Sequence, residues 1–350
     1  MNSVPSKLEN NVDELYRKNQ VKSIRFLVIL SGVLLLAILL SLRAGSYETP
    51  IGELIKGIFG MSADRKINIV VQNNRLPRIV TAILAGSGLG LAGCILQAVL
   101  RNPLASSSTL GVSQGATFGA AFAIVILGMG ASDRFGIPLC AFAGSIAVAL
   151  VILGLSKFRQ VSPEGIVLAG VAISSMFTGA TTLIQYFADE VQLSTLVFWT
   201  FGDLGSTGWE DLGGMAVIVV LLCIYCFVHR WDYNALLSGE ETAISLGINV
   251  KRLTLVGMVL CCLTSSVVVS NVGLISFIGL VAPHIVRMVV GNNHVYLIPG
   301  SILGGATLLL LGDLFARTVI SPVILPIGAI TSFLGGPLFL YLLFKGGKKQ

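Results

Sequence analysis

The chain alternates long apolar stretches with short polar ones, and this pattern runs from residue 26 almost to its end. An α-helix needs about 17 to 25 mainly apolar residues to cross a hydrocarbon layer about 30 Å thick. Stretches of this length recur often enough to predict about ten transmembrane helices. The predicted spans cover residues 26–42, 79–100, 112–129, 137–155, 165–187, 212–228, 253–269, 273–290, 295–316 and 324–344.

Composition agrees with this pattern, because 54% of the residues are hydrophobic and only 11% are charged. Such a chain cannot cover a water-soluble core with polar side chains. We therefore predict an all-α polytopic membrane protein in which residues 26–344 form a single transmembrane domain. Residues 1–25 would form a polar cytoplasmic tail and residues 345–350 a basic one, and no connecting segment is long enough for a second domain.

Lysine and arginine near the span ends favour a cytoplasmic location for both termini, because positive charge accumulates on that side of a membrane. A basic segment that breaks this rule either has another use or serves as ordinary interfacial anchoring. The net charge of +6 is mostly this topology signal and does not indicate nucleic-acid binding. The residues that fall on the outer side against the rule are Arg43, Lys56, Arg65, Lys66, Arg75 and Arg78.

Glycines recur at four-residue spacing within the apolar stretches, which clears one helix face for close approach by a neighbour. Residues 88–93 also satisfy the pattern G-x-G-x-x-G, but that motif works at a strand-to-helix turn and here it lies inside an apolar helix. The sequence has no nucleotide-binding P-loop, so the chain is not predicted to be an enzyme. The candidate helix-packing glycines are Gly86, Gly90, Gly93, Gly111 and Gly115.

Side chains that catalyse reactions or bind metals are sparse in the spans. The six cysteines lie in apolar stretches, and the three histidines share no ligand spacing with cysteine or carboxylate. We therefore expect no catalytic residue, no metal site and no cofactor bound by this chain. Carboxylates are nearly absent from the middle of the spans, which disfavours a proton- or sodium-driven carrier. Asp313 stands four residues before Arg317 near a span end, where the two can neutralise each other.

Hydroxyl groups gather on the fifth predicted span, where Ser174, Ser175 and Thr178 follow one another closely. A stripe of this kind can line a wet passage for a large solute. The hydroxyls can equally well bond to carbonyl groups of their own helix, and the sequence leaves both interpretations open.

The longest predicted cytoplasmic loop covers residues 231–252 and has an apolar pattern of its own. Leu237, Ala243, Ile244 and Leu246, with the closing Gly247, predict one or two short amphipathic helices at the membrane face. An amphipathic helix can dock into a groove on a soluble partner, which would bring energy to a protein without its own ATPase motif.

Ordered motifs along the chain resemble the FecCD family, the permease subunits of ABC importers for iron-siderophore complexes, haem and vitamin B12. The resemblance implies the type II permease architecture of ABC importers, in a bacterial cytoplasmic membrane. The motifs are Arg75-Leu-Pro-Arg78, Gly90-Leu-Ala-Gly93-x-x-Leu-Gln97, Asn102-Pro-Leu-Ala105, Leu110-Gly-Val-Ser113, Leu168-Ala-Gly-Val171, Phe198-Trp-Thr-Phe-Gly202, Gly239-Glu-Glu241 with Leu246-Gly247, Phe277-Ile-Gly-Leu-Val-Ala-Pro-His284, Leu325-Pro-Ile-Gly328 and Gly336-Pro337.

The resemblance also implies partners. A second permease subunit, identical or homologous, would complete a central pathway within the membrane lipid. Two cytoplasmic ATPase subunits would bind and hydrolyse Mg-ATP, and an extracytoplasmic binding protein would deliver a metal-chelate substrate. A ferric siderophore is the expected substrate, with haem and cobalamin as alternatives.

Residue roles follow from the same resemblance. Arg75, Arg78 and Arg317 would dock glutamates of the binding protein, because a guanidinium group can hold a carboxylate with two hydrogen bonds. The chain departs from the family at Ile324, where an acidic residue is expected. The other implied roles are ATPase coupling by Glu240, Glu241, Leu246 and Gly247, pathway lining by Leu168, Ser174, Ser175 and Thr178, and a hinge at Pro283 and His284.

Overall fold

The computed structural model describes residues 4–45, 47, 49–130, 133–157 and 162–346. Residues 347–350 of the predicted basic tail lie outside this part of the chain. The described residues form helices and connecting segments without a strand, which confirms the all-α class. The longer helices are α1 (Val4–Arg43), α4 (Leu76–Val99), α6 (Gly136–Lys157), α7 (Pro163–Tyr186), α9 (Trp209–Val228), α12 (Val250–Val272), α14 (His294–Thr318) and α15 (Ile327–Gly346).

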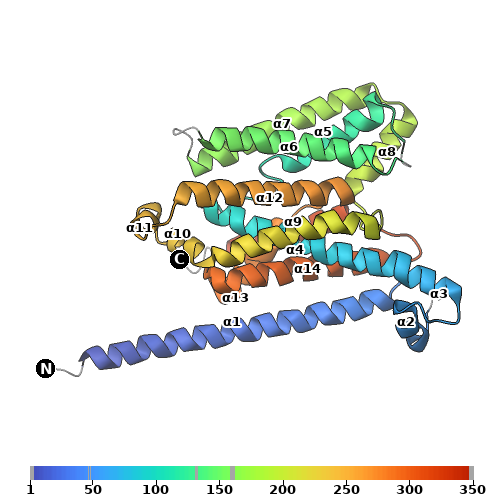
Figure 1. Ribbon diagram of the computed structural model, residues 1–350. Helices are drawn as coiled ribbons and strands as arrows, with labels where there is room; N and C mark the ends of the chain where they lie inside the picture. Colours follow the sequence, from blue (N-terminus) through green and yellow to red (C-terminus); the bar gives the residue numbers. More distant parts are fainter. Residues whose placement is uncertain (1–3, 46, 48, 131–132, 158–161, 347–350) are drawn as a thin grey trace.

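Shorter helices flank or join the long ones. They are α2 (Ile51–Ile58), α3 (Arg65–Val70), η1 (Val71–Arg75), α5 (Val112–Ala121), η2 (Phe122–Ile126), α8 (Glu190–Phe201), α10 (Arg230–Leu237), α11 (Glu240–Ser245) and α13 (Ile278–Val290). The long helices run side by side, with α2, α3 and α8 at one end of the bundle and α10 and α11 at the other (Figure 1). These are called the α3 end and the α11 end below.

Among the described residues, seven helices are long and apolar enough to cross a membrane. Three shorter apolar helices, Val112–Ile126, Ile278–Val290 and Ile327–Tyr341, complete a set of ten. The predicted span 273–290 is wrong at its start, because its helix begins only at Ile278. Gly273 and Phe277 have φ angles of 75° and 66°, which interrupt the helix. The 13 residues of α13 rise only about 20 Å, so α13 does not cross the hydrocarbon layer alone.

The first helix is longer than the sequence pattern suggested. The predicted tail from Val4 onward and the first predicted span belong to one continuous helix, α1, of 40 residues. Residues 6–25 contain neither proline nor glycine, so nothing in this polar stretch stops the helix. The N-terminal part of α1 projects beyond the α11 end (Figure 1).

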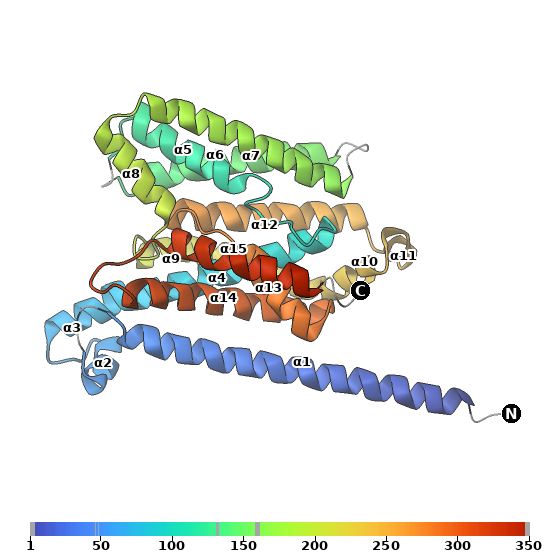
Figure 2. The same cartoon turned by 180° about the vertical axis from the view of Figure 1, so that it is seen from behind.

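Helix α4 lies at the centre of the bundle. In the most apolar stretch of 18 residues of its span, 83% of the residues are buried, whereas the corresponding share for α1 is 11%. Helix α4 packs on α14, α12, α13 and α9, and α13 and α15 cover one face of this centre (Figure 2). Small residues permit this approach. A Cβ atom would lie 2.4 Å from a carbonyl oxygen at Gly86, 2.5 Å at Gly90 and 1.6 Å at Gly93, so helix backbones meet directly at these positions.

The two remaining candidate packing glycines lie on or next to α5. A Cβ atom at Gly115 would stand 2.5 Å from the carbonyl oxygen of Gly144 on α6. Gly111 instead precedes α5 with a φ of 87°, a left-handed conformation that glycine adopts without strain. The chain needs Gly111 for its backbone conformation as well as for space.

Candidate functional site

Three charged side chains form a buried network at the α3 end. Arg78 lies in the first turn of α4, whereas Asp313 and Arg317 lie one turn apart on α14. The fully buried carboxylate of Asp313 accepts a hydrogen bond from Arg78 Nε at 2.8 Å and one from Arg317 Nε at 2.9 Å. The predicted pairing of Asp313 with Arg317 is therefore confirmed, and Arg78 joins it from a distant part of the sequence.

Arg317 and the neighbouring Arg75 hold the end of α1 and the segment that follows it. Arg75 donates from Nη1 to the Leu42 carbonyl at 2.8 Å and from Nη2 to the Tyr47 carbonyl at 2.6 Å. Arg317 donates from Nη1 to the Ala44 carbonyl at 3.0 Å. Arginine suits this position because its several N–H groups can satisfy carbonyls that a helix end leaves without partners.

The structure thus brings Arg75, Arg78 and Arg317 together, but turns them inward. Arg75 is 5% exposed, Arg78 is 6% exposed, and the side chain of Arg317 is 8% exposed. Their hydrogen bonds go to oxygens of this same chain, so none presents a free guanidinium fork at the surface. Docking of a partner by these residues stays a prediction, whereas their internal contacts tie α1, α4 and α14 together.

The short helices at this end are joined by their own polar contacts. The Glu53 carboxylate accepts hydrogen bonds from Lys56 Nζ at 2.8 Å and from Ser62 Oγ at 2.7 Å. These contacts, with that of Lys56 first, lower the pKa of Glu53 below its ordinary value. Tyr47 donates to Asp64 at 3.1 Å, and this hydrogen bond raises the pKa of Tyr47.

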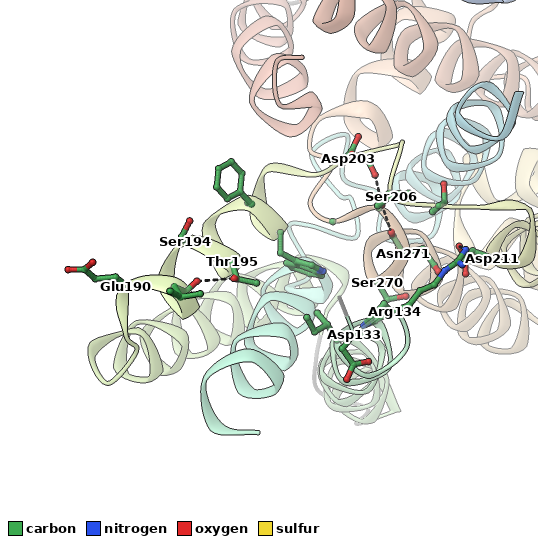
Figure 3. A pocket seen from close by; sticks show the side chains of 18 residues that line it. Asp133, Arg134, Glu190, Ser194, Thr195, Asp203, Ser206, Asp211, Ser270 and Asn271 are labelled. Atoms are coloured by element: carbon green, nitrogen blue, oxygen red, sulfur yellow. Dashed lines mark hydrogen bonds and ion pairs between the residues drawn. The ribbon is translucent and has the colours of Figure 1, made fainter. Parts of the chain in front are cut away.

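A pocket of about 1010 Å³ opens beside the buried network of Arg78, Asp313 and Arg317. It lies between the start of α6, helix α8, the start of α9 and the end of α12 (Figure 3). Acidic, amide and hydroxyl groups dominate its polar lining. These residues are Asp133, Arg134, Glu190, Ser194, Thr195, Asp203, Ser206, Thr207, Asp211, Ser270 and Asn271.

Local sequence explains the walls of this pocket. Helix α8 starts with a capping box in which Asp189 and Gln192 accept hydrogen bonds from each other's backbone N–H at 2.8 and 3.1 Å. Gly202 and Gly273 then reverse the chain with φ angles of 71° and 75°. A Cβ atom at Gly273 would lie 2.4 Å from the Trp199 carbonyl oxygen, so the two reversals pack against each other without room for a side chain.

Arg134 and Asp203 connect the pocket to the rest of the α3 end. Arg134 forms ion pairs of 3.3 Å with Glu210 and with Asp211, which ties the start of α6 to the start of α9. Asp203 lines the pocket and also contacts Arg78 Nη1 at 3.3 Å. The buried network and the pocket therefore share a side chain.

The residues predicted to line a pathway on α7 do not line this pocket. Ser174 and Ser175 donate to the Gly170 and Val171 carbonyls of their own helix at 2.7 and 3.1 Å, as the alternative interpretation of these hydroxyls required. Leu168 is 71% exposed, and Thr178 is exposed as well. They lie on a helix of which little is buried within this chain.

The predicted spans end at residue 187 and resume at residue 212. Sequence reasoning therefore assigned α8 to no span and missed its role in the pocket. The spacing Asp189-x-x-Gln192 before an apolar run was a readable helix-start signal. Nothing local in the sequence indicated that Ser194 and Thr195 would face Ser206 and Asn271 across one cavity.

The opposite end carries the two short helices predicted for the loop 231–252. On α11, Glu240 forms an ion pair of 3.3 Å with Arg101, which follows the end of α4, and Glu241 is exposed. Gly247 has a φ of 84° and ends this helical segment. Of the apolar residues, Ala243 is buried, whereas Leu237, Ile244 and Leu246 are 51%, 56% and 66% exposed. The α11 end therefore presents an apolar surface next to acidic groups.

The predicted hinge lies within α13. Pro283 is buried in the interior of this helix, where it removes one backbone hydrogen bond. The ring of His284 approaches the ring of Phe339 on α15, with 5.9 Å between their centroids. The structure shows one conformation of this region, so hinge motion stays a prediction. Ile324 is 53% exposed in the segment before α15.

Among the described residues, no group of three histidine, cysteine or acidic side chains could hold a metal ion. The six cysteines are free thiols. The candidate site is a pocket with apolar and polar walls, next to the buried ion pairs of Asp313.

Comparison with known proteins decides the family. A model of the FecCD transport family matches residues 33–345. This chain belongs to the FecCD transport family. It is a multi-pass membrane permease, and its observed helices are those of the permease architecture that the motifs predicted.

Three relatives illustrate the similarity. A protein of Methanocaldococcus jannaschii, named as an ABC transporter permease, is 47% identical over 97% of this chain and 99% of its own length. The vitamin B12 import system permease of Escherichia coli is 36% identical over 95% of this chain and 99% of its own. A solved inward-facing structure of a metal-chelate type ABC transporter matches with a TM-score of 0.81 and 31% identity, over 92% of this chain and 99% of that one.

Proposed function

We propose that this chain forms the transmembrane pathway of a binding-protein-dependent ABC importer for a ferric siderophore or a related metal chelate. The observation that carries this proposal is the likeness in fold and sequence to a metal-chelate type ABC transporter over nearly the whole chain. The pocket at the α3 end adds support, because it is wide and its mainly apolar walls also carry oxygen groups. Such a lining suits a large solute with apolar and polar parts that is passed on and not tightly held.

A second permease subunit would complete the pathway. Only 17% of the residues in the most apolar stretch of 18 residues of α7 are buried within this chain. Leu183 on α7 and Phe198 on α8 are 68% and 69% exposed, and Phe198 also lines the pocket. An identical or homologous subunit that covered these side chains would close the open side of a passage that begins at the pocket.

Energy would come from ATPase subunits bound at the α11 end, which hold the Mg-ATP. The apolar side chains of Ile244 and Leu246 project there from helices that rest on the membrane domain through the buried Ala243. An exposed apolar surface of this kind on a short helix fits a groove on a soluble protein. Because Glu240 contacts Arg101 next to α4, a displacement of α11 would reach the centre of the bundle.

The binding protein would dock at the α3 end. Arg78 and Arg317 pair with Asp313 and the exposed Asp203. Arg75 lies beside this network and donates to carbonyl groups only, so it adds a positive charge without an acidic partner among the described residues. One nitrogen of Arg317, Nη2, is buried without a hydrogen-bond partner among the described residues. An acidic group of a partner that reached this cluster would supply the missing acceptor.

The deciding experiment is uptake into proteoliposomes that contain the permease and its ATPase, with ATP inside and the cognate binding protein outside. Ferric hydroxamate, ferric catecholate, haem and cobalamin are offered separately. We expect ATP-dependent uptake of a ferric chelate. Uptake of haem or cobalamin alone would replace the substrate assignment but keep the importer.

A second arm of this experiment addresses the carrier class. Ionophores are added while the internal ATP is maintained. Uptake that collapses with the ion gradient and continues without ATP would overturn the importer proposal in favour of an ion-coupled carrier. Uptake that needs ATP and ignores the ionophores supports the importer.

A further inference from the structure

The middle of α1, residues 14–29, forms one wall of a cleft of about 650 Å³ toward the α11 end. Four basic residues of α1 line it: Arg17, Lys18, Lys22 and Arg25. Val289 on α13 forms part of the opposite wall. Basic residues thus concentrate in a hollow between two helices of a membrane domain.

Most of this positive charge has no acidic partner among the side chains that the structure describes. Lys18 pairs with Glu14 at 2.7 Å. Arg17, Lys22 and Arg25 are exposed and form no ion pair with an acid among the side chains that the structure describes. Three cations on two to three turns of one helix repel each other unless an anion lies between them.

Apolar side chains continue the cleft toward the membrane interior. Val21, Phe26 and Ile29 lie among its lining residues. Phe26 also packs against a small core of Cys94, Val286 and Leu297, which fixes the cleft to the bundle. The cleft therefore joins a basic mouth to an apolar floor.

The depth of two of these cations, Arg25 and Lys22, matches that of lipid headgroups. The apolar part of α1 starts directly after Arg25. At 1.5 Å per residue, Lys22 lies about 4 Å and Arg17 about 12 Å further along the helix axis. The headgroup layer on each side of a bilayer is about 5 to 8 Å thick, so Arg25 and Lys22 fall within it and Arg17 lies just beyond.

We propose that this cleft binds the phosphate headgroup of an anionic membrane lipid, with a hydrocarbon chain of that lipid along Phe26 and Ile29. Basic pockets between helices at a membrane surface bind anionic headgroups in this way. The apolar floor selects a lipid over a free phosphate ion, which has nothing to place there. The site is separate from the pocket at the α3 end and does not depend on which substrate the permease carries.

The test uses the full chain with all three unpaired cations neutralised, as R17Q/K22Q/R25Q. A matched control, R230Q/K251Q/R252Q, removes three exposed or partly exposed basic residues at the same end that do not line the cleft. Phosphatidylglycerol and phosphatidylcholine are titrated into delipidated protein in detergent, and bound lipid is counted by native mass spectrometry. Inorganic phosphate serves as a competitor.

Each basic residue at a membrane surface contributes about fivefold to the affinity for anionic lipid, so the triple variant should bind phosphatidylglycerol about 100-fold more weakly. We expect the control to bind like the unmodified chain, and R17K/R25K to retain binding. Equal binding by the triple variant, equal loss in the control, or equal affinity for phosphatidylcholine would overturn the proposal. Displacement by inorganic phosphate at the concentration of the lipid would overturn the choice of a lipid.

Discussion

Asp313 offers a direct test of how the α3 end is held together. The substitution D313N keeps the size of the side chain and removes its charge. Asp313 is fully buried, and the side chains of Arg78 and Arg317 are each 8% exposed. Two guanidinium groups would therefore stay buried opposite a neutral amide. Loss of one member of a buried ion pair costs about 3 to 5 kcal/mol, and we expect D313N to lower the free energy of unfolding by that amount.

Asp203 supplies the matched control, because D203N removes a carboxylate from the same Arg78. The side chain of Asp203 is 57% exposed and lies 3.3 Å from Arg78 Nη1. Water can solvate the side chain at position 203 after the change, and Arg78 keeps its hydrogen bond to Asp313. We therefore expect a loss of only about 0 to 1 kcal/mol, as for an exposed ion pair. The two variants therefore make the same chemical substitution around one arginine and differ in burial.

Unfolding is followed by titration with sodium dodecyl sulfate in mixed micelles, with far-ultraviolet circular dichroism as the signal. Both variants and the unmodified chain are compared under one set of conditions. A loss below about 1 kcal/mol for D313N, or equal losses for D313N and D203N, would refute the conclusion that the buried carboxylate holds this end together.

Three further predictions concern packing and coupling. G93A would place a Cβ atom 1.6 Å from a carbonyl oxygen of α13, so we expect no folded monomer in gel filtration. The control G213A places a Cβ atom with no other atom within 4 Å and should elute like the unmodified chain. L246D places a charge on the exposed apolar surface of α11 and should abolish copurification with the ATPase at an unchanged melting temperature; retained copurification would contradict that interface. R101A removes the contact of α4 with Glu240, and we expect transport per ATP hydrolysed to fall, while an unchanged ratio would show that this contact does not transmit motion.

The order of the spans could be predicted because apolar length is a local property of the sequence. The structure keeps that order but changes several boundaries for local reasons. Helix α1 runs back to Val4 because the polar segment contains no helix breaker, and α13 starts late because Gly273 and Phe277 adopt left-handed backbone angles. A hydropathy profile cannot show either effect, because it sums the free energies of transfer of single residues and ignores backbone conformation.

The pocket could not be predicted in the same way, because its walls come from four segments that meet only in the fold. Helix α8 has 12 residues, too few to register as a span, and its polar positions resemble a loop when each is considered alone. Capping chemistry at Asp189 and Gln192 identifies the helix but says nothing of its neighbours. The cavity forms only where these four segments meet in the fold.

The arginines show most clearly where sequence reasoning ends. The positive-inside rule reports the side of the membrane on which a charge lies, but not the direction in which its side chain points. Asp313 and Arg317 are one helical turn apart, so their pairing could be predicted from the sequence. Arg78 and Asp313 are 235 residues apart in the sequence, and no local pattern reveals their contact. Because one carboxylate receives two arginines and Arg75 turns to carbonyl groups, the cluster keeps an excess of positive charge while it holds α1 in place. The proposed docking of an acidic partner therefore has to reach guanidinium groups that are buried, and Nη2 of Arg317 is the nitrogen that still lacks an acceptor among the described residues.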